Sequence, residues 1–593
     1  MSEPRTLLDI FDLWRAASPT PALVDARGGG QNSLPAPEVA RRVAGLAKGL
    51  EALGVGKGDR VALLCGDRPE WHMVDFAVLH LGALDVPIYP TLLAAQARAI
   101  LADSGARAVV AENPEQLAKV LEVRGACPEL KDVLLIDGEA PAGVRTLASC
   151  TVELPQGEAE AFLEGCRPRV QPEDLATLIY TSGTTGEPKG VMLTHDNFVF
   201  DASSSASTMA WPTSGATALA FLPLSHVLER LVDYCYFLQG LTVAYCVILE
   251  TADAIRRVRP QIFTAVPRFY EKVYDRVLHE VSLGPKLKQS LFRTALRVGL
   301  EGVRTGRKGF RYRLFDLLVF SKIRAALGGR IRFSISGGAP LPVFIGEFFH
   351  AMGVKALEGY GLTETSPVIT VNRFDRWKLG TVGPPIPGVE VRIAPDGEVL
   401  TRGRHVMRGY WNKPEDTAAV LDPQGWLATG DIGELDGESF LRITDRKKDI
   451  LVTAGGKNVA PQPVENQLTA SPLVENAVLF GDRKPYIVAL IVPGFEALDA
   501  WAGKRGLPTA DRAALLERPE VQAAYQEVVD GVNANLARFE TIKRFRLIAE
   551  PFTISGGQLT PTLKVKRRVI EQRFAALLAA MYEEGSPATS PEH

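Results

Sequence analysis

Hydrophobic and polar positions follow a repeating pattern through the first half of the chain. An apolar run at residues 60–65 precedes a helix-like stretch at 69–84 and a second apolar run at 85–90. Similar runs follow at 106–112, 132–137, 176–182, 241–249, 261–267 and 330–338. Short apolar runs that alternate with helical periodicity are typical of parallel βαβ units whose sheets are covered on both faces.

The pattern changes at about residue 380, where short strands with frequent Gly and Pro predict a small β-barrel over about 380–445. A polar stretch at 444–449 predicts a hinge, and strands alternate with helices again after it. We therefore predict an α/β protein with a large N-terminal domain, residues 1–445, that contains two βαβ-type layered subdomains and the β-barrel. A small, mobile α+β C-terminal domain, residues 446–593, follows.

Composition and charge argue against several classes of protein, among them nucleic-acid-binding, secreted and membrane-spanning proteins. The net charge is −2, whereas a protein that binds nucleic-acid phosphates usually carries a basic excess, so we predict no nucleic-acid partner. Six cysteines without a C-x-x-C pair fit a reducing compartment. The N-terminus lacks the apolar core of a secretory segment, and the longest apolar run is about half of what a membrane span needs. These features predict a soluble, cytoplasmic protein.

Residues 286–332 differ from the rest of the chain. They contain 13 Lys or Arg against two acids, and their apolar residues recur at helical spacing, which predicts a basic helical arm over about 280–330. One interpretation is a solvated arm with a charged outer face. The other is an amphipathic surface for anionic membranes or for an acyl-chain donor.

The strongest motif is YTSGTTGEPKG at 180–190, which follows an apolar strand. Its glycines let the backbone approach a phosphate, while its hydroxyls and N–H groups can donate to phosphate oxygens. The string is not a Walker A loop, because G-x-x-x-x-G-K-[ST] is absent. A flexible turn is the alternative for a Gly/Ser/Thr loop considered alone.

This string resembles the phosphate loop of the acyl-adenylate-forming synthetases. Five more segments resemble motifs of that family in the same order: SGGAPL (336–341), EGYGLTET (358–365), WLATGDIGEL (426–435), DRKKDILVTAGGKNVAP (445–461) and LTPTLKVKR (559–567). The stretch at 436–466 and the basic arm resemble long-chain fatty acyl-CoA synthetases of bacterial type. The chain is identified as a member of that branch.

The resemblance implies an ATP site. Its predicted nucleotide contacts are Thr181, Ser182, Gly183, Thr184, Thr185, Gly186, Lys189, Gly338, Ala339, Pro340, Glu358, Gly359, Tyr360, Gly361, Thr363, Asp431, Ile443 and Arg446. Tyr360 offers a flat face for adenine, and Asp431 can accept both ribose hydroxyls. Considered alone, Tyr360 has a core aromatic residue as its alternative interpretation, and Asp431 has a turn-forming Asp before a strand.

The resemblance also implies the catalytic groups. Lys564 would bridge the substrate carboxylate and the α-phosphate, and Leu563 before it matches the long-chain branch. Glu364 and the hydroxyl of Thr184 would bind Mg²⁺, which prefers oxygen ligands. His226 would lie beside the carboxylate and later the thiol, although a lone His is more often structural.

Further residues are implied for the second half-reaction. Lys448 would be the pivot of domain rotation, and Gly455, Gly456 and Lys457 would line the pantetheine tunnel of coenzyme A. A surface ion pair is the alternative for Arg446 and Lys448. Arg230 stands where some long-chain relatives have a Trp gate, and our hypothesis is that it pairs with Glu229 or another acid to close the acyl tunnel.

The predicted function is ATP-dependent activation of a long-chain fatty acid through acyl-AMP, then thioesterification to coenzyme A. Alternatives are a fatty acyl-AMP ligase that serves a carrier protein, an aryl or other carboxylate–CoA ligase, and a catalytically weak scaffold that binds acyl groups or nucleotides. A membrane-anchored structural role is weaker, because no span is present. The predicted partners are the small-molecule substrates fatty acid, ATP and coenzyme A. Peripheral membrane contact through 286–332 is a further hypothesis, and a homodimer is one that the family resemblance suggests.

Overall fold

The computed structural model describes residues 3–17, 20–182, 188–212, 215–554, 556–560 and 565–583, with only the backbone for Ser182. The chain divides into two compact units. Unit 1 comprises Met1–Ala394, Val399–Thr429 and Leu435–Arg442, and unit 2 comprises Pro395–Glu398, Gly430–Glu434 and Ile443–His593. The domain boundary expected between residues 445 and 446 stays a prediction.

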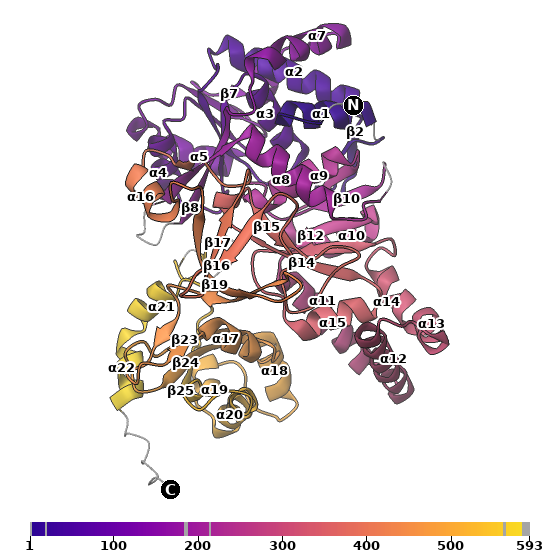
Figure 1. The fold of residues 1–593 in the computed structure, drawn as a ribbon, viewed down its shortest axis with the longest axis vertical. Coiled ribbons are helices and arrows are strands. Elements are labelled where there is room, and N and C mark those ends of the chain that lie inside the picture. Colours follow the sequence, from indigo (N-terminus) through magenta and orange to yellow (C-terminus); the bar gives the residue numbers. More distant parts are fainter. Residues whose placement is uncertain are drawn as a thin grey trace. The chain divides into compact units, whose positions relative to one another are not determined.

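Unit 1 contains two eight-stranded sheets (Figure 1). The strands of the first are β3 (Arg60–Leu64), β4 (Leu84–Ile88), β5 (Ala108–Ala111), β6 (Asp132–Leu135), β7 (Arg145–Thr146), β8 (Leu175–Ser182), β9 (Pro188–Thr194) and β18 (Gly409–Tyr410). Their order is β18-β9-β8-β4-β3-β5-β6-β7. β3 to β6 pair in parallel, whereas β8 and β9 pair antiparallel.

The strands of the second sheet are β1 (Leu23–Asp25), β2 (Asn32–Leu34), β10 (Thr217–Ala220), β11 (Thr242–Tyr245), β12 (Ile262–Ala265), β13 (Phe333–Ser336), β14 (Lys355–Gly361) and β15 (Val368–Val371). Their order is β15-β14-β13-β12-β10-β11-β1-β2. The five strands from β10 to β14 pair in parallel. The predicted alternation of strands and helices is therefore confirmed.

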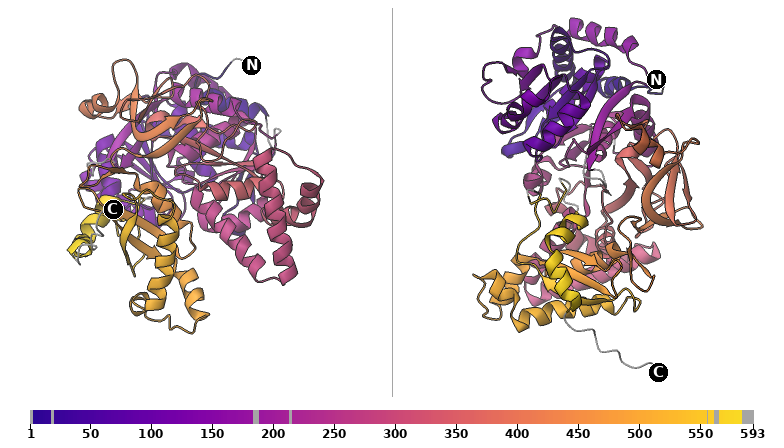
Figure 2. Two further views of the ribbon diagram at one scale, coloured as in Figure 1. Left: turned by 60° about the horizontal axis from the view of Figure 1, so that its bottom comes forward. Right: turned by 90° about the vertical axis from the view of Figure 1, so that its left-hand side faces the viewer.

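The helices of unit 1 are α1 (Leu7–Ala17), α2 (Ala36–Ala52), α3 (Pro69–His80), α4 (Ala94–Ser104), α5 (Pro114–Val123), α6 (Leu147–Cys150), α7 (Gln156–Cys166), α8 (His195–Ser207), α9 (Val227–Leu238), α10 (Thr251–Val258), α11 (Pro267–Ser282), α12 (Lys286–Thr305), α13 (Phe310–Phe315), α14 (Ser321–Ala326), α15 (Val343–Ala351) and α16 (Pro414–Val420). α11 to α14 cover the predicted basic arm and project from the unit (Figure 2). Local sequence sets several helix starts: α3 begins with Pro69, and the side chain of Asn113 accepts from Gln116 N–H at the start of α5.

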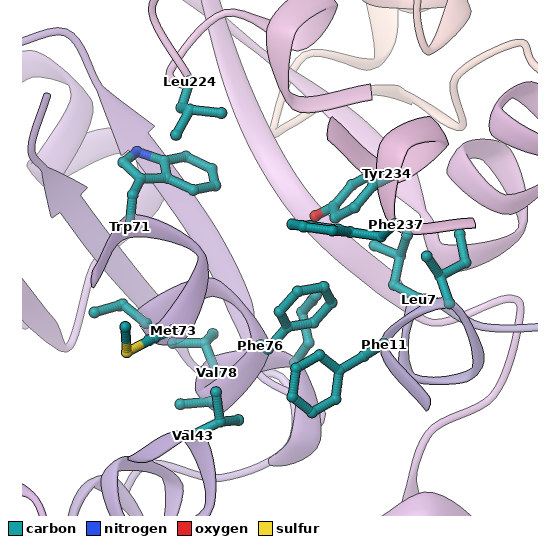
Figure 3. Packing of buried hydrophobic residues seen from close by; sticks show 14 of the residues in the cluster. Leu7, Phe11, Val43, Trp71, Met73, Phe76, Val78, Leu224, Tyr234 and Phe237 are labelled. Carbon is teal, nitrogen blue, oxygen red and sulfur yellow. The ribbon is translucent and has the colours of Figure 1, made fainter. Parts of the chain in front are cut away.

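Both sheets are buried on both faces. Successive side chains of a strand point to opposite faces of the sheet, so neighbouring residues contact different cores. Val61 and Leu63 of β3 face a core that also includes residues of the second sheet and of α1, α3, α8 and α9, whereas Ala62 and Leu64 face a separate core with α4 and α5. In the shared core, the aromatic rings of α3 lie close to those of α9 (Figure 3). The near-continuous apolar runs of the sequence follow from this double burial.

The segment that we predicted as a β-barrel forms a four-stranded sheet of β16 (Glu390–Ile393), β17 (Glu398–Arg402), β19 (Leu427–Leu435) and β20 (Leu441–Arg446), in that order. Unit 2 has a two-stranded sheet of β21 (Leu451–Val452) and β22 (Asn458–Val459), and a three-stranded sheet of β23 (Val474–Phe480), β24 (Ile487–Pro493) and β25 (Ile542–Leu547). Its helices are α17 (Pro461–Thr469), α18 (Phe495–Gly503), α19 (Arg512–Leu516), α20 (Pro519–Asn533), α21 (Arg567–Arg573) and α22 (Ala575–Glu583). Every residue of β24 is buried, so this strand forms the centre of a separate core.

No helix among the described residues is both long enough and apolar enough to cross a bilayer. The α/β architecture, with a large N-terminal part of mixed sheets and a smaller C-terminal part, agrees with the predicted fold class.

Candidate active site

Several predicted site residues lie at one edge of the second sheet of unit 1. The carboxyl ends of parallel strands meet at the same edge of a sheet, where α/β proteins bind ligands. β10 leads into the segment with His226, β13 leads into Gly338, Ala339 and Pro340, and β14 ends at Gly361. Gly338, Ala339 and Pro340 are exposed, so this predicted adenine segment is accessible within unit 1.

Glu358 connects two of these segments. It lies on β14 opposite Ser336 of β13, and its Oε2 accepts a hydrogen bond from the backbone N–H of Leu341 at 3.2 Å. Burial raises the pKa of Glu358 to about 7, against the opposing effect of N–H groups from Leu341 and Gly380. Glu358 therefore holds the adenine segment against β14.

The end of β14 is closely packed against β15. Tyr360 lies opposite Thr370, and its ring packs beside an apolar cluster that includes Ile369 and Val371. A Cβ on Gly361 would lie 1.6 Å from the carbonyl oxygen of Pro367, so only glycine fits there. Gly359 and Tyr360 are half-buried, as is Thr363 after the turn, which leaves part of each accessible.

The two ends of the predicted phosphate-loop string lie on β8 and β9. Thr181 pairs with Lys189 across the hairpin, and the hairpin continues to the pair Ser182 and Pro188. Gly183, Thr184, Thr185 and Gly186 lie outside the described residues, as does the side chain of Ser182. Lys189 is mostly buried, and its Nζ pairs with Asp416 Oδ1 at 2.6 Å.

Glu364 is brought to this hairpin by a residue that the sequence did not single out. Tyr410 on β18 pairs with Val191 of β9, and its hydroxyl donates to Glu364 Oε1 at 2.7 Å. Lys189 Nζ lies 5.2 Å from the centre of the same ring. Burial and the Glu364 carboxylate raise the pKa of Tyr410, so it remains a donor. Glu364 thus lies close to β9, the strand that follows the predicted phosphate loop in the sequence.

His226 caps the N-terminus of α9. Its Nδ1 accepts from the backbone N–H of Leu228 at 3.1 Å, and the residue is half-buried. A Cβ on Gly337 would lie 2.9 Å from the Leu228 side chain, so the adenine segment begins close to this helix start. His226 therefore has a structural role and a position beside the predicted nucleotide segment.

Arg230 lies one turn further along α9 and is fully buried. Its guanidinium pairs with Asp75 at 2.6 Å and Asp85 at 3.3 Å, so the prediction that it pairs with an acid is confirmed. Glu229 is not that acid, because both of its oxygens lack a hydrogen-bond partner among the described residues. The suggested closure of an acyl tunnel by Arg230 stays a prediction.

The remaining described site residues lie in unit 2. Asp431 on β19 is buried, and its Oδ1 pairs with Arg446 Nε on β20 at 3.0 Å, so the two predicted ribose contacts are neighbours. Ile443 is half-buried on the same strand as Arg446, and Lys448 is exposed just after it. Arg446 therefore forms an ion pair within unit 2, as its alternative interpretation predicted. Its contact with a nucleotide stays a prediction.

The predicted coenzyme A residues form a tight turn between β21 and β22. Thr453 accepts from Lys457 N–H at 3.2 Å through its hydroxyl, and Gly456 has a φ of +69°, which favours glycine. Gly455, Gly456 and Lys457 are all exposed. Lys564 lies outside the described residues, between Thr560 and Val565.

Sequence analysis missed Tyr410 and Asp416, which contact Glu364 and Lys189. Neither lies in a motif with characteristic spacing, and both are far from their partners in the sequence. The pairing of β18 with β9 brings them together, and a two-residue strand gives too short a pattern to be found from the sequence.

Comparisons with known proteins agree with these features. The AMP-binding enzyme family matches residues 13–411, and the AMP-binding enzyme C-terminal domain matches residues 448–586. The chain belongs to the AMP-binding enzyme family. It is 40% identical over 561 residues to a long-chain-fatty-acid–CoA ligase, FadD15, of Mycobacterium bovis, covering 92% of both chains. It is 33% identical to the peroxisomal long chain acyl-CoA synthetase 6 of Arabidopsis thaliana, covering 91% of this chain and 80% of the relative.

Two solved structures share the fold of this chain. The anthranilate CoA ligase AuaEII, in complex with anthranoyl-AMP, has a TM-score of 0.72 at 21% identity and covers 98% of this chain and 99% of its own. A fatty acyl CoA synthetase of Mycobacterium tuberculosis has a TM-score of 0.60 at 23% identity, covering 97% and 99%. The family resemblance recognised from six short motifs is confirmed by the family match and by the 40% identity to FadD15 over 92% of the chain.

Proposed function

We propose that this family member is a long-chain fatty acid–CoA ligase that forms AMP. The observation that carries the proposal is the 40% identity to a long-chain-fatty-acid–CoA ligase over 92% of the chain. The placement of Glu364 beside the β8–β9 hairpin supports it, because an enzyme that cleaves ATP needs oxygen ligands and a phosphate loop together.

The reaction has two steps. A fatty carboxylate oxygen attacks the α-phosphorus of ATP, and the bond to the bridging oxygen of the β-phosphate breaks, which gives acyl-AMP and pyrophosphate. The thiolate of coenzyme A then attacks the acyl carbonyl carbon, and AMP leaves with the electron pair of the broken C–O bond. In the first step two anions must meet, and two unit charges at ~4 Å repel by about 4 kcal/mol at an effective dielectric of 20.

The chain supplies positive charge against this repulsion. We propose that Lys564 bridges the carboxylate and the α-phosphate in the first step, as the family resemblance implies. The small C-terminal domain would then rotate about Lys448 and bring the exposed Gly455–Gly456–Lys457 turn to the pantetheine chain. Domain rotation fits the need for two active geometries on one acyl group.

Glu364 and Thr184 are the residues that would hold Mg²⁺. Among the described residues no group of three or more His, Cys, Asp or Glu could hold a metal. Mg²⁺ fits this arrangement nonetheless, because it usually binds through one or two protein oxygens, with waters and substrate phosphates completing its shell. When bound, it supplies charge that offsets the phosphates, and Tyr410 orients the Glu364 carboxylate that receives it.

Two further points belong to the same proposal. We propose a cytoplasmic enzyme that associates peripherally with membranes through the basic arm at 286–332. We also propose a homodimer, which light scattering of the purified protein tests directly.

The decisive experiment measures AMP and pyrophosphate release with ATP, Mg²⁺ and a series of acids from acetate to C20, with and without coenzyme A. We expect AMP release that requires coenzyme A and is greatest with C12–C18 acids. The matched control is Glu364→Gln, which keeps the shape of the side chain and removes its charge.

Other outcomes would favour the alternatives. Pyrophosphate release without thioester formation would indicate a fatty acyl-AMP ligase that serves a carrier protein. Turnover of benzoate but not of fatty acids would indicate an aryl–CoA ligase. If no acid led to AMP or pyrophosphate release, the chain would be a scaffold that binds acyl groups or nucleotides without the activity.

A further inference from the structure

Lys189 has an anionic partner that the sequence did not indicate. Lys189 belongs to the predicted phosphate-loop string and lies on β9, where it pairs with Thr181 of β8. Its Nζ lies 2.6 Å from Oδ1 of Asp416 on α16. The lysine that we expect to meet the phosphates of ATP therefore has a carboxylate of the protein itself within direct contact.

The packing of α16 fixes the position of Asp416. The hydroxyl of Thr417, the next residue, accepts a hydrogen bond from the backbone N–H of Tyr410 on β18 at 2.9 Å. A Cβ on Gly409 would lie 2.8 Å from the Thr417 side chain, so the helix packs closely against β18. Since β18 pairs with β9, Asp416 and Lys189 are carried by elements that are joined to each other.

The ion pair is of a kind that another anion can replace. The side chain of Asp416 is 38% exposed, and an ion pair with this exposure contributes little to stability, because water solvates its charges. The ammonium has a second contact, since Nζ lies 5.2 Å from the centre of the Tyr410 ring, within the range of a cation–π interaction. Lys189 can therefore release Asp416 and remain beside Tyr410.

The charges of this group limit how strongly it can hold phosphate. Glu364 accepts a hydrogen bond from the Tyr410 hydroxyl at 2.7 Å, and burial, Glu364 and Asp416 all raise the pKa of Tyr410. One ammonium and two carboxylates give the group a net charge of −1. A polyphosphate that binds Lys189 must take it from Asp416, and Asp416 can take it back when pyrophosphate leaves.

We propose that Asp416 is a positioning residue that competes with the phosphates of ATP and of pyrophosphate for Lys189, and that it thereby speeds the release of pyrophosphate. The inference rests on the proposed function, because it assigns Asp416 to the product-release step of that reaction. Two unit charges ~4 Å apart in water change an equilibrium constant by about fivefold. An effect of this size lets the product leave without preventing ATP from binding.

Calorimetric binding of magnesium pyrophosphate to the full-length protein tests the proposal without turnover. Asp416→Asn keeps the size of the side chain and removes its charge, so we expect it to bind pyrophosphate about fivefold more tightly. Asp416→Glu keeps the charge and should bind nearly as the unchanged protein does. Glu415→Gln is the matched control, because Glu415 is an exposed acid beside Asp416 on the same helix, and its affinity should stay unchanged.

The Lys189→Met background tests the competition itself. Without the ammonium, Asp416→Asn should change the affinity for pyrophosphate by less than about twofold, because the partner through which Asp416 acts is gone. An equal gain in both backgrounds would mean that Asp416 only repels phosphate through space, and the proposal would be wrong. Unchanged affinity in the single variant Asp416→Asn would also overturn it.

Steady-state kinetics separates this role from a structural one and from the proposed function. For Asp416→Asn we expect a lower KM for ATP and stronger product inhibition by pyrophosphate, whereas damage to α16 would raise KM. If the unchanged protein released no AMP with any acid, the proposed function would fail, while the affinities would still decide the competition for Lys189. Normal AMP release with identical pyrophosphate inhibition in both proteins would remove only the role of Asp416.

Discussion

Two groups of charged residues in unit 1 have similar composition and different surroundings. Around Arg230, the acids Asp75 and Asp85 are fully buried between the two large sheets. Around Tyr410, the charged residues Lys189 and Glu364 lie beside a hairpin and keep part of their surface accessible. The acids of the first group are fully enclosed with their cation, whereas Lys189, although paired with Asp416, and Glu364 both keep part of their surface accessible.

The contrast shows why charge alone does not identify a site. Arg230 also donates to Thr177 and Tyr234, and three aromatic rings lie within 6 Å of its guanidinium. Burial works against ionisation of Asp75, yet the Arg230 guanidinium holds the pKa of that carboxyl below its ordinary value. Such a cluster joins α3, β4 and α9 inside unit 1, whereas Lys189 and Glu364 are only partly enclosed.

The largest expected effect comes from Arg230→Met. The change leaves Asp75 and Asp85 buried without a cation, and breaking a buried pair in this way typically costs about 3–5 kcal/mol of unfolding free energy. Urea denaturation followed by intrinsic fluorescence measures the loss.

Two variants sharpen this test. Arg230→Met combined with Asp75→Asn should recover part of the stability, because one uncompensated charge is removed. Arg230→Lys should be intermediate, since an ammonium cannot reproduce the forked contacts. If Arg230→Lys instead kept full stability and changed the preferred chain length, Arg230 would belong to the acyl tunnel and the comparison would fail.

The next effect concerns the second group. Glu364→Gln should lower the rate of adenylate formation by about 10²–10³-fold, the usual cost of removing a preorganised electrostatic group. The stability of the variant should stay close to that of the unchanged protein, because Glu364 is not enclosed. Pyrophosphate release at saturating ATP measures the rate, and raising the Mg²⁺ concentration should restore part of it. A variant that unfolds early while keeping its rate would place Glu364 with the structural group.

Glu358 shares a feature with each of the two groups. It is buried like the acids around Arg230, and it lies at the candidate site like Glu364. Its folded pKa of about 7 lies above the unfolded value of 4.5. The folded state therefore retains a proton that the unfolded state has lost, and stability falls as pH rises from 4.5 to about 7. Glu358→Gln cannot ionise, so its stability relative to the unchanged protein should rise by about 1.4 kcal/mol per pH unit in this window and level off above it. Urea midpoints at pH 5, 6, 7 and 8 test this, and a constant difference would mean that Glu358 ionises normally.

Sequence analysis predicted local features better than distant pairings. The apolar runs at 60–65 and 85–90 became β3 and β4, because strands buried on both faces need near-continuous apolar residues. The run at 241–249 became only the four residues of β11, since the chain turns outward at Ile248 and Leu249. The motif with Glu364 was found, but its contact with Tyr410, 46 residues further along the chain, accompanies the pairing of β18 with β9, which no local pattern encodes. Arg230 was noticed only as a departure from a family pattern, and its partner Asp75 is 155 residues away.

The smallest expected effect is that of Tyr410→Phe, which probes how far Glu364 depends on its neighbour. The change removes one hydroxyl that donates to a carboxylate at 2.7 Å and keeps the ring beside Lys189. A hydrogen bond to a charged group contributes about 1.5–3 kcal/mol at most, and water can replace part of it at a half-exposed site. We expect a rate loss of roughly threefold to tenfold, with a higher Mg²⁺ requirement because the carboxylate is less well oriented.

In the Glu364→Gln background the same change should have almost no further effect, since the oriented charge is already gone. If the rate losses of the two single variants multiplied in the double variant, Tyr410 would act through Lys189 rather than through Glu364. The residues around Tyr410 would then form two separate contacts instead of one group.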